Sequence, residues 1–304
     1  MQVILWFIFS QINMMSVTVD DLPGAGLRIE TQDYAEILQG IQNQLKSFDA
    51  PAIGFVNETK LYRDEKLQVE RLALLRAWMK AGYELGNHTF SHHSLHRTEL
   101  TDYLVDIKKG ETLLRPLLAE FGQVPRYFRH PMLHTGQTME TKAKVHSFLK
   151  ELGYQIAPVT IDSSEWIYAR AYDRALLDRE QDLASRIAND YVRYMLDKTA
   201  YFERQSEVLL GRNMAQTLLI HANRLNRDHL NRLLGDLKDR GYRFVTLEEA
   251  LKDPAYQMED RFTGRGGITW LHRWCIGEGK RDLILPNEPE ASPFVMDASG
   301  LASE

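Results

Sequence analysis

The sequence predicts an α/β fold in which a parallel sheet, built from seven β/α repeats, curls into a barrel. Short apolar runs rich in β-branched residues alternate along the chain with longer segments of helical periodicity. Several of the helical segments end in a glycine that can adopt positive φ, such as Gly82, Gly153 and Gly241, directly before the next apolar run. Polar residues capable of chemistry follow these runs, at the sheet edge where such barrels carry their active sites.

Each expected strand is a short run of residues that favour extended backbone, bounded by turn-forming residues. In chain order, the strands are expected at residues 16–20, 52–56, 83–86, 127–129, 155–160, 217–220 and 243–246. Amphipathic spacing predicts helices between them, at residues 34–46, 67–81, 100–121, 138–152, 178–204 and 228–240. Because each helix carries the chain back to the start of the sheet, the strands are expected to be parallel.

Three segments are expected along the chain. Residues 1–15 include an apolar run with the length of a signal-peptide core, but no Lys or Arg precedes it and no small-residue cleavage site follows. An extra buried strand, or a true start at Met14 or Met15, is the alternative interpretation. Residues 16–252 are expected to form the barrel, and residues 253–304 an extension that packs on it and ends in an irregular tail.

Composition excludes several classes of protein. The chain has 304 residues, of which 44% are hydrophobic and 26% charged, as in an ordinary globular protein. A net charge of −5 with scattered Lys and Arg gives no basic field, so nucleic acid is not expected as a partner. The single Cys275 excludes an intrachain disulfide and a cysteine-rich zinc site. The N-terminal apolar run is too short to span a bilayer, so no stable membrane span is expected.

Two pairs of polar residues predict a metal site. Asp20 and Asp21 end the first expected strand, and His88 and His92 follow the third. One carboxylate and two imidazoles suit a divalent metal that activates water, and the second carboxylate is then free to act as a base. Taken alone, the aspartates are more often a helix N-cap and a loop acid.

Three further polar residues occupy the same kind of position. Arg129 ends the fourth expected strand, Asp162 follows the fifth and His221 ends the sixth. Since the carboxyl ends of parallel strands meet at one edge of the sheet, these side chains are expected to lie close to the aspartates and histidines.

The motifs around these residues resemble those of the polysaccharide deacetylases of the NodB-homology type, also called carbohydrate esterase family 4. Five motifs in the family's order carry the resemblance, at residues 18–21 (TVDD), 88–92 (HTFSH), 129–131 (RHP), 162–166 (DSSEW) and 219–221 (LIH). The similarity covers roughly residues 16–251. The third motif is matched only in its first half, because Met132 and Leu133 stand where the family has an aromatic residue and Gly.

The resemblance implies a distorted parallel (β/α)7 barrel and one divalent metal ion held by Asp21, His88 and His92. Zinc is the expected metal, with cobalt or nickel as alternatives. The histidine cluster continues to His93 and His96, and a continuous helix could instead present His88, His92 and His96 on one face. The pair used by the resemblance is preferred, because Asp21 completes it.

The resemblance also assigns roles to the remaining site residues. Asp20 is expected to be the general base, oriented by an ion pair with Arg129 that would lower its pKa further. His221 is expected to protonate the leaving group as imidazolium, with Asp162 stabilising its charge.

Two more residues are expected to contact the substrate. The main-chain N–H of Met132 is expected to help hold the oxyanion. Trp166 is a core or groove aromatic that could stack on a pyranose ring. Trp270 and Trp274, outside the matched region, either line a groove or fasten the extension to the barrel, and fastening is favoured.

The implied function is that of a metal-dependent hydrolase acting on carbon–nitrogen bonds other than peptide bonds, which removes N-acetyl groups from a peptidoglycan-like or chitin-like glycan. The alternatives are an esterase that removes O-acetyl groups, as from xylan, and a non-catalytic glycan-binding relative. A decayed enzyme would lack a ligand, the base or the acid, whereas all of these are present in the chain. A glycan substrate favours the cell envelope, periplasmic or secreted, with the cytoplasm as the alternative.

Overall fold

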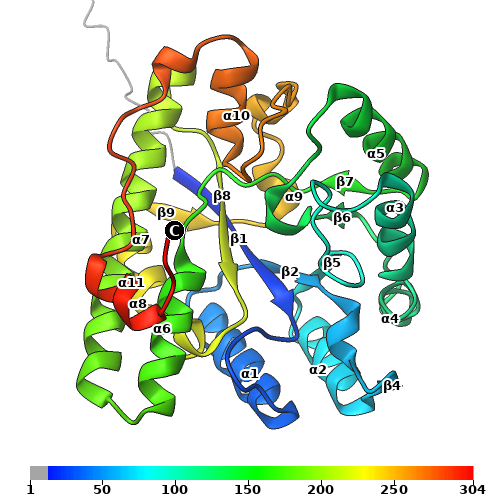
Figure 1. Cartoon of the computed structure of the whole chain (residues 1–304), viewed down its shortest axis with the longest axis vertical. Helices are drawn as coiled ribbons and strands as arrows, with labels where there is room; N and C mark the ends of the chain where they lie inside the picture. The colour runs from blue at the N-terminus through cyan, green and yellow to red at the C-terminus, as the bar shows by residue number, and fades with distance from the viewer. Residues whose placement is uncertain (1–12, 304) are drawn as a thin grey trace, which may run out of the picture.

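The strands form one parallel sheet that curls around a packed interior (Figure 1). The computed structural model describes residues 13–303. Within them, the sheet follows the order β7-β6-β5-β2-β1-β8, and β9 pairs with β1. Its strands are β1 (Asn13–Leu22), β2 (Ala52–Val56), β5 (Glu84–Asn87), β6 (Tyr127–Phe128), β7 (Gln155–Ile156), β8 (Gln216–His221) and β9 (Tyr242–Phe244).

The two edges of the sheet meet through very few hydrogen bonds. Just after β7, Ile161 makes an isolated parallel bridge with Leu218 of β8, and its N–H donates to the carbonyl of Thr217 over 3.0 Å. On the other side, β9 pairs only with residues 13–15 at the start of β1. The predicted barrel class is therefore confirmed. The barrel is distorted where its edges meet, because only the short contact between Ile161 and β8 joins them.

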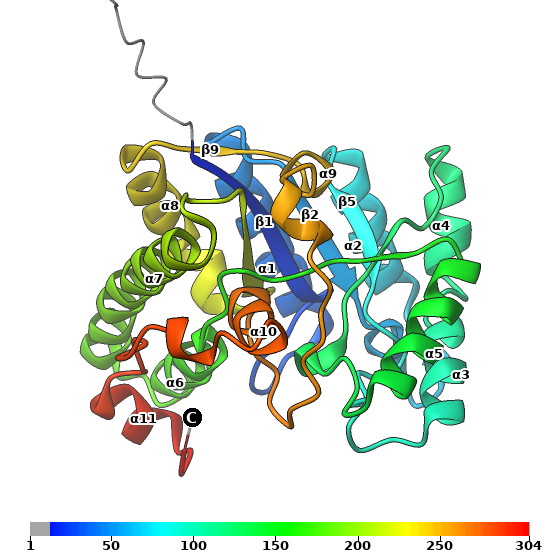
Figure 2. The same ribbon diagram turned by 90° about the horizontal axis from the view of Figure 1, so that it is seen from above.

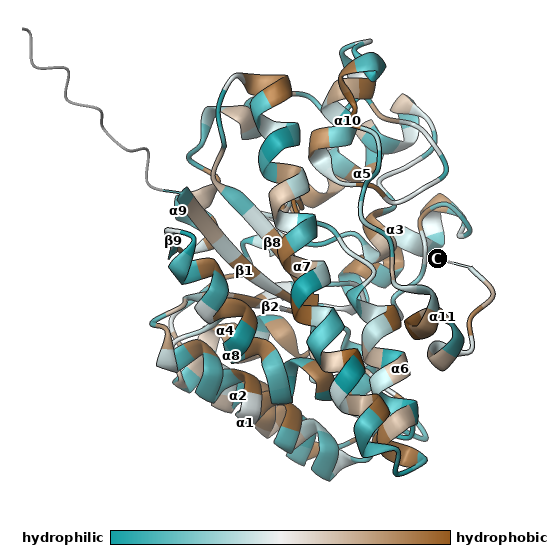
Figure 3. Cartoon of the chain, turned by 90° about the vertical axis from the view of Figure 1, so that its left-hand side faces the viewer, coloured by the Kyte–Doolittle hydropathy of each residue, from teal (hydrophilic) through white to brown (hydrophobic). Residues whose placement is uncertain are grey.

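Helices surround the sheet, and Figure 2 shows them arranged around β1 and β2. They are α1 (Thr31–Ser47), α2 (Val69–Lys80), α3 (Leu100–Lys109), α4 (Leu114–Glu120), α5 (Met139–Glu151), α6 (Glu165–Leu177), α7 (Gln181–Leu210), α8 (Arg224–Asp239), α9 (Leu247–Ala250), α10 (Trp270–Gly277) and α11 (Pro293–Ser299). Hydrophilic residues are found on the outer surfaces of the helices, and hydrophobic residues on the strands of the sheet (Figure 3). A small antiparallel hairpin, β3 (Tyr62–Arg63) with β4 (Lys66–Leu67), was not expected from the sequence.

The helix predicted at 100–121 is wrong as a single element. It is broken between α3 and α4 at Gly110, where a Cβ would lie 2.7 Å from the main chain of Thr89. The glycine thus lets the histidine-bearing loop pack directly on the helix end.

Helix α6 was missed by the sequence prediction. Its buried residues surround most of its circumference, because it packs against α7, α8 and α11. Such a helix shows no single apolar stripe, so periodicity does not reveal it. The helix predicted at 178–204 is real but shifted, and α7 begins at Gln181 and continues to Leu210.

The C-terminal extension is ordered and packs on the barrel. Trp270 and Trp274 of α10 are both buried, in agreement with their expected fastening role. Residues 285–292 are irregular, but the tail prediction is wrong at α11, which packs against α6. No helix among residues 13–303 is long and apolar enough to cross a membrane. Most of the signal-like segment, residues 1–12, lies outside the described residues, whereas residues 13–15 belong to β1.

The buried tryptophan of the extension provides a test of its attachment. Trp274 is 1% exposed and its Nε1 donates to the carbonyl of Met258 over 3.2 Å. Trp274→Ala is expected to lower the free energy of unfolding by about 3–5 kcal/mol, through lost burial and the cavity left behind. Urea denaturation followed by circular dichroism measures this loss. Val208→Ala, at a half-exposed position of α7, is the control. Equal urea midpoints for the two variants would contradict a stabilising role of Trp274.

Candidate active site

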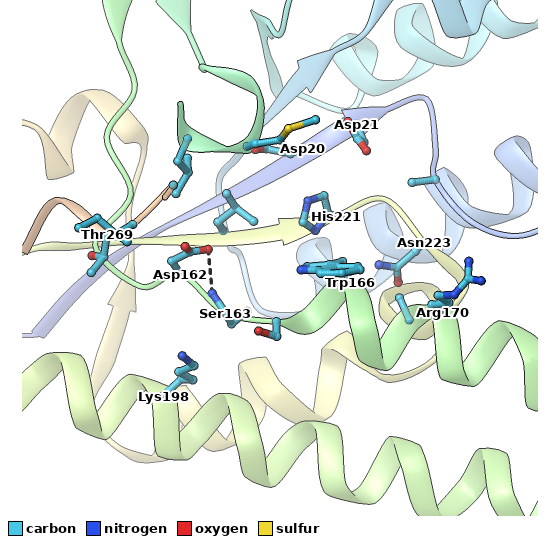
Figure 4. Close-up of a pocket in the computed structure, with 18 of the residues that line it drawn as sticks. Asp20, Asp21, Asp162, Ser163, Trp166, Arg170, Lys198, His221, Asn223 and Thr269 are labelled. Carbon is cyan, nitrogen blue, oxygen red and sulfur yellow. Dashed lines mark hydrogen bonds between the residues drawn. The ribbon is translucent and has the colours of Figure 1, made fainter. Parts of the chain in front are cut away.

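A cavity of about 970 Å³ opens at the carboxyl ends of the strands. It is lined by eight of the nine residues predicted for the site, and Figure 4 shows several of them projecting into it: Asp20, Asp21, His88, His92, Met132, Asp162, Trp166 and His221. The ninth, Arg129, is fully buried beside Asp20. Residues more than two hundred positions apart in sequence therefore converge, as the strand-end argument predicts.

The backbone at the end of β1 directs both aspartates into this cavity. Successive side chains of a regular strand point to opposite faces. Here the register with β2 shifts between Val19 and Leu22, and Asp21 adopts a left-handed backbone with φ of 72°. This irregularity reorients Asp21, so that the two neighbouring carboxylates share one cavity.

Asp21, His88 and His92 form a compact group suited to a metal ion. Their ligand atoms all lie within 4.8 Å of one another. Asp21 Oδ1 is 3.5 Å from Nε2 of His92 and 3.9 Å from Nε2 of His88. That oxygen is buried and has no hydrogen-bond partner among the described residues. A buried carboxylate oxygen without a donor, facing two imidazole nitrogens, fits the donor set of a divalent metal.

The protonation of the two histidines also fits this interpretation. Burial lowers the pKa of His88 and of His92 to about 4, so both rings are neutral near pH 7. Nδ1 of His88 lies 2.7 Å from the carbonyl of Arg129, which requires the proton on Nδ1 and leaves the Nε2 lone pair free. Such a bond is the usual means of orienting a metal-binding histidine.

Lys60 supports Asp21 from outside the cavity. Its Nζ is 3.3 Å from Oδ2 and 3.2 Å from the main-chain oxygen of Asp21. Although burial alone would raise it, Lys60 and the neighbouring histidines hold the pKa of Asp21 well below its usual range. Asp21 is therefore a carboxylate under all ordinary conditions. No sequence motif pointed to Lys60.

Asp20 is the second carboxylate, and its environment differs from the predicted one. It is 2% exposed and its Oδ2 lies 3.6 Å from Nη1 of Arg129, an ion pair longer than a hydrogen bond. Burial outweighs the charge of Arg129 and raises the pKa of Asp20, so the predicted lowering is wrong. Arg129 is itself held by a 3.0 Å bond from Nη2 to Thr18 Oγ1.

The carboxylate that contacts His221 is Glu165, and the predicted pairing with Asp162 is wrong. Glu165 Oε2 accepts from Nδ1 of His221 over 2.7 Å. Its Oε1 accepts from the side-chain amides of Asn223 and Asn226, so the carboxylate is fixed on both sides. Burial alone would lower the pKa of His221, but the bond and charge of Glu165 raise it to about 9. His221 is therefore an imidazolium whose Nε2 is not engaged by Glu165.

Asp162 lies in the cavity but is oriented otherwise. Its Oδ1 accepts from the main-chain N–H of Ser163 over 2.9 Å, the bond drawn in Figure 4. Burial raises its pKa to about 6, against the charge of Lys198. The acid that reaches His221 is Glu165, which lies in the same five-residue motif directly before Trp166 and was not predicted for the site.

The altered third motif forms a tight turn at the cavity. Met132 and Leu133 both have left-handed backbones, with φ of 55° and 52°. Met132 is 48% exposed, whereas Leu133 is buried. A Cβ on Gly267 of the extension would lie 1.8 Å from the carbonyl oxygen of Met132, so only glycine fits there. The extension is thus in direct contact with the loop where the motif departs from the family.

The structure also decides between the alternative interpretations of Trp166 and of the histidine cluster. Trp166 is 45% exposed and lines the cavity, which favours the groove interpretation over the core. Residues 88–99 contain no helix, so the three-histidine helix is wrong. His96 is engaged elsewhere, with Nε2 accepting from the N–H of Gly136 and Nδ1 donating to the carbonyl of Arg265. His93 is exposed.

Comparison with known proteins confirms the resemblance predicted from the motifs. Residues 10–157 match the family model described as polysaccharide deacetylase. A chitin deacetylase from Arthroderma benhamiae is 26% identical over 184 residues, which cover 60% of this chain and 40% of that protein. The chain thus spans about two fifths of the length of this curated relative.

Solved structures share the fold. A polysaccharide deacetylase from Bacillus cereus aligns with a TM-score of 0.52 at 19% identity, covering 77% of this chain and 91% of that one. A CE4 family pseudoenzyme from Bacillus anthracis aligns with a TM-score of 0.50 at 16% identity, covering 79% and 65% of the two chains. At these identities the likeness concerns the fold alone. Since one of the two is a pseudoenzyme, activity has to be argued from the site residues.

The contact between Glu165 and His221 predicts a measurable titration. In metal-free protein, Glu165→Gln removes the negative charge that keeps the imidazolium protonated. The pKa of His221 is therefore expected to fall from about 9 by roughly 1–2 units, so that the ring loses its proton at lower pH. Histidine NMR titration measures the shift. Glu151→Gln, at an exposed position at the end of α5, should leave it unchanged. An unaltered pKa in Glu165→Gln would exclude the proposed cause.

Proposed function

We propose that this chain, whose residues 10–157 match the polysaccharide deacetylase family, is a metal-dependent hydrolase that removes N-acetyl groups from an amino-sugar-containing glycan. One observation carries the proposal. A three-residue metal-ligand group, a further buried carboxylate and a protonated histidine line the same cavity. These are the three components that metal-assisted hydrolysis of an amide uses, namely an electrophilic metal, a base and an acid.

Asp21, His88 and His92 would hold the metal ion, zinc by preference and cobalt or nickel as alternatives. When bound, the ion supplies a Lewis acid that polarises the acetyl carbonyl and makes water easier to deprotonate. The protein keeps both imidazoles neutral and the carboxylate ionised, so its ligands are in the required state near pH 7.

Asp20 is the residue suited to take the proton from the attacking water. It lies beside the ligand group, with Oδ2 3.7 Å from Nε2 of His88, and its buried Oδ1 has no hydrogen-bond partner among residues 13–303. Burial raises its pKa, which makes it a stronger base than a free aspartate. Arg129 fixes its orientation from behind, where substrate does not reach.

His221 is the residue suited to protonate the leaving group. An amine leaves readily only when it receives a proton, and His221 carries one up to a pKa of about 9. Glu165 fixes the ring through Nδ1, so the proton is delivered from Nε2. The N–H of Met132 would donate to the developing oxyanion, and Trp166 offers an exposed ring to a sugar face.

The substrate class follows from the leaving group and the family. A histidine held protonated at neutral pH benefits an amine leaving group most, which favours N-acetyl over O-acetyl substrates. The chitin deacetylase similar to this chain supports an N-acetylated amino sugar, in a chitin-like or peptidoglycan-like glycan. With such a substrate, we place the protein at the cell envelope.

The base assignment is tested by Asp20→Asn. The variant is expected to lose turnover by about 10³-fold or more, because the amide cannot accept the proton of water. Acetate release from an N-acetylated chito-oligosaccharide, restored with zinc after chelation, measures turnover, and calorimetry measures zinc binding. Zinc should still bind, since Asp21, His88 and His92 are intact. Asp239→Asn, exposed at the end of α8, serves as control. Wild-type turnover in Asp20→Asn would refute the role of base.

The acid assignment is tested with two substrates. His221→Ala is expected to slow N-deacetylation by about 10²–10⁴-fold, and hydrolysis of 4-nitrophenyl acetate by less than about tenfold, because nitrophenolate leaves without protonation. The ratio of the two values of kcat/KM is the measurement. His146→Ala, at an exposed position of α5, should change neither rate. Equal losses on both substrates would show that His221 has another role.

A further inference from the structure

The C-terminal extension contributes a continuous part of the cavity wall. It lines the cavity with residues 267–269, His272, residues 288–290 and Leu301. In Figure 2, α10 and α11 lie on the same side of the molecule as α6, in the lower left of the view. These wall segments belong to the side of the cavity formed by α6 and α7, because α11 packs against α6 and α10 against α7.

Hydrogen bonds hold this wall to the barrel at its start, its middle and its end. At its start, the N–H of Trp270 donates to the carbonyl of Val159 over 2.8 Å, next to the close approach of Gly267 to Met132. In its middle, Tyr201 of α7 donates through its hydroxyl to the carbonyl of Leu285 over 2.6 Å. At its end, Arg170 Nε donates to the carbonyl of Ser299 over 2.9 Å. The extension is therefore a fixed boundary of the cavity.

An ion pair between a buried lysine and a partly exposed glutamate lies within this wall. The side chain of Lys198 is 7% exposed, and its Nζ bonds to Oε1 of Glu288. His272 lies behind the pair, with Nδ1 3.8 Å from Glu288 Oε2, and burial lowers its pKa, so it adds no charge near pH 7. Lys198 projects from α7 towards Asp162 (Figure 4), whose carboxyl group it influences electrostatically. The catalytic steps use neither Lys198 nor Glu288.

The chemistry of this pair selects the kind of group that it can bind. Its two charges cancel, so neither an anionic nor a cationic ligand gains from it. The ammonium can donate a further hydrogen bond and the partly exposed carboxylate can accept one, as adjacent hydroxyl groups of a sugar require. A lysine kept in a cavity wall at this desolvation cost suggests a binding role, because a surface ion pair would be as stable without burial.

The volume of the cavity also favours a short ligand. Its volume of about 970 Å³ lies at the upper end of the roughly 300–1,000 Å³ typical of small-molecule pockets. A groove for a long polymer must be open on both sides of the reacting unit. Here the extension supplies the cavity wall on the α6 and α7 side, from Gly267 at the Met132 loop to Leu301, just after the bond between Arg170 and Ser299.

We propose that the extension ends the substrate site on this side, so that the enzyme acts on short N-acetylated oligosaccharides and chain ends, with Lys198 and Glu288 binding the hydroxyl groups of the terminal sugar. This inference rests on the function proposed above. It assigns to residues 253–304 a role in selecting substrate length.

Substrate length is the first test. With chito-oligosaccharides of one to six units, kcat/KM is expected to reach its maximum by about three units, and mass spectrometry should place the free amine at one chain end. Chitin polymer should release acetate at least about tenfold more slowly per reactive unit. A value of kcat/KM that rises through the hexamer, with internal units deacetylated, would overturn the proposal.

The ion pair is tested by two substitutions. Lys198→Met and Glu288→Gln are each expected to raise KM for the trimer about fivefold or more, with kcat within about twofold of wild type. Glu288→Gln preserves shape, so it remains informative if Lys198→Met does not fold. Lys144→Met, exposed on α5, is the matched control. Unchanged KM in Glu288→Gln would overturn the role of the pair.

Binding separates this inference from the proposed function. Calorimetry with Asp20→Asn, which is expected not to turn over, measures affinity for each oligosaccharide without chemistry. Affinity that levels off by three units supports a closed site even if the wild-type protein releases no acetate, an outcome that would refute only the proposed hydrolase. Absent binding, or affinity that rises through six units, would overturn the closed site even if acetate is released.

Discussion

The left-handed backbone at Asp21 is the constraint on which the arrangement of the site depends. It places two consecutive carboxylates in one cavity, although a regular strand would send them to opposite faces. β1 can carry this distortion because it is paired with β8 along Met15 to Asp20, and with β2 from Val17 to Val19 and again at Leu22. The strain is therefore confined to the last residues of a strand fixed on both sides, as is common for functional residues.

Burial then gives residues of the same type opposite states. Burial by itself lowers the pKa of all three histidines. His88 and His92 have a pKa of about 4, whereas His221 has a pKa of about 9. The difference is the carboxylate of Glu165, which is bonded directly to the ring of His221. A similar contrast separates Asp20 from Asp21, since Lys60 and the histidines compensate the burial of Asp21, whereas Arg129, 3.6 Å from Asp20, does not outweigh the burial of that residue. Neutral imidazoles, a carboxyl group of raised pKa and an imidazolium thus coexist within one cavity.

The sequence predicted the features that depend on chain order and strand ends. Parallel strands bring their carboxyl ends to one edge, so Asp20, His88 and His221 could be placed together from their positions alone. It failed where a choice depended on side-chain geometry. Asp162 and Glu165 are both carboxylates of the same short motif, and only the start of α6 decides which one faces His221. Lys60 lies in a segment without any pattern, and its contact with Asp21 depends on the turn that follows β2.

The departure in the third motif and the presence of the extension are parts of one structural feature. The family places an aromatic residue and a glycine in this loop, whereas Met132 and Leu133 here adopt left-handed backbones at a cost of about 1 kcal/mol or more each. Such a conformation persists only where its surroundings enforce it. The buried guanidinium of Arg273, in the extension, bonds to the carbonyl of Leu133 and to Thr135, and Gly267 allows the extension to approach Met132. The loop therefore keeps its turn because residues far downstream hold it, and one of them, Gly267, also lines the cavity.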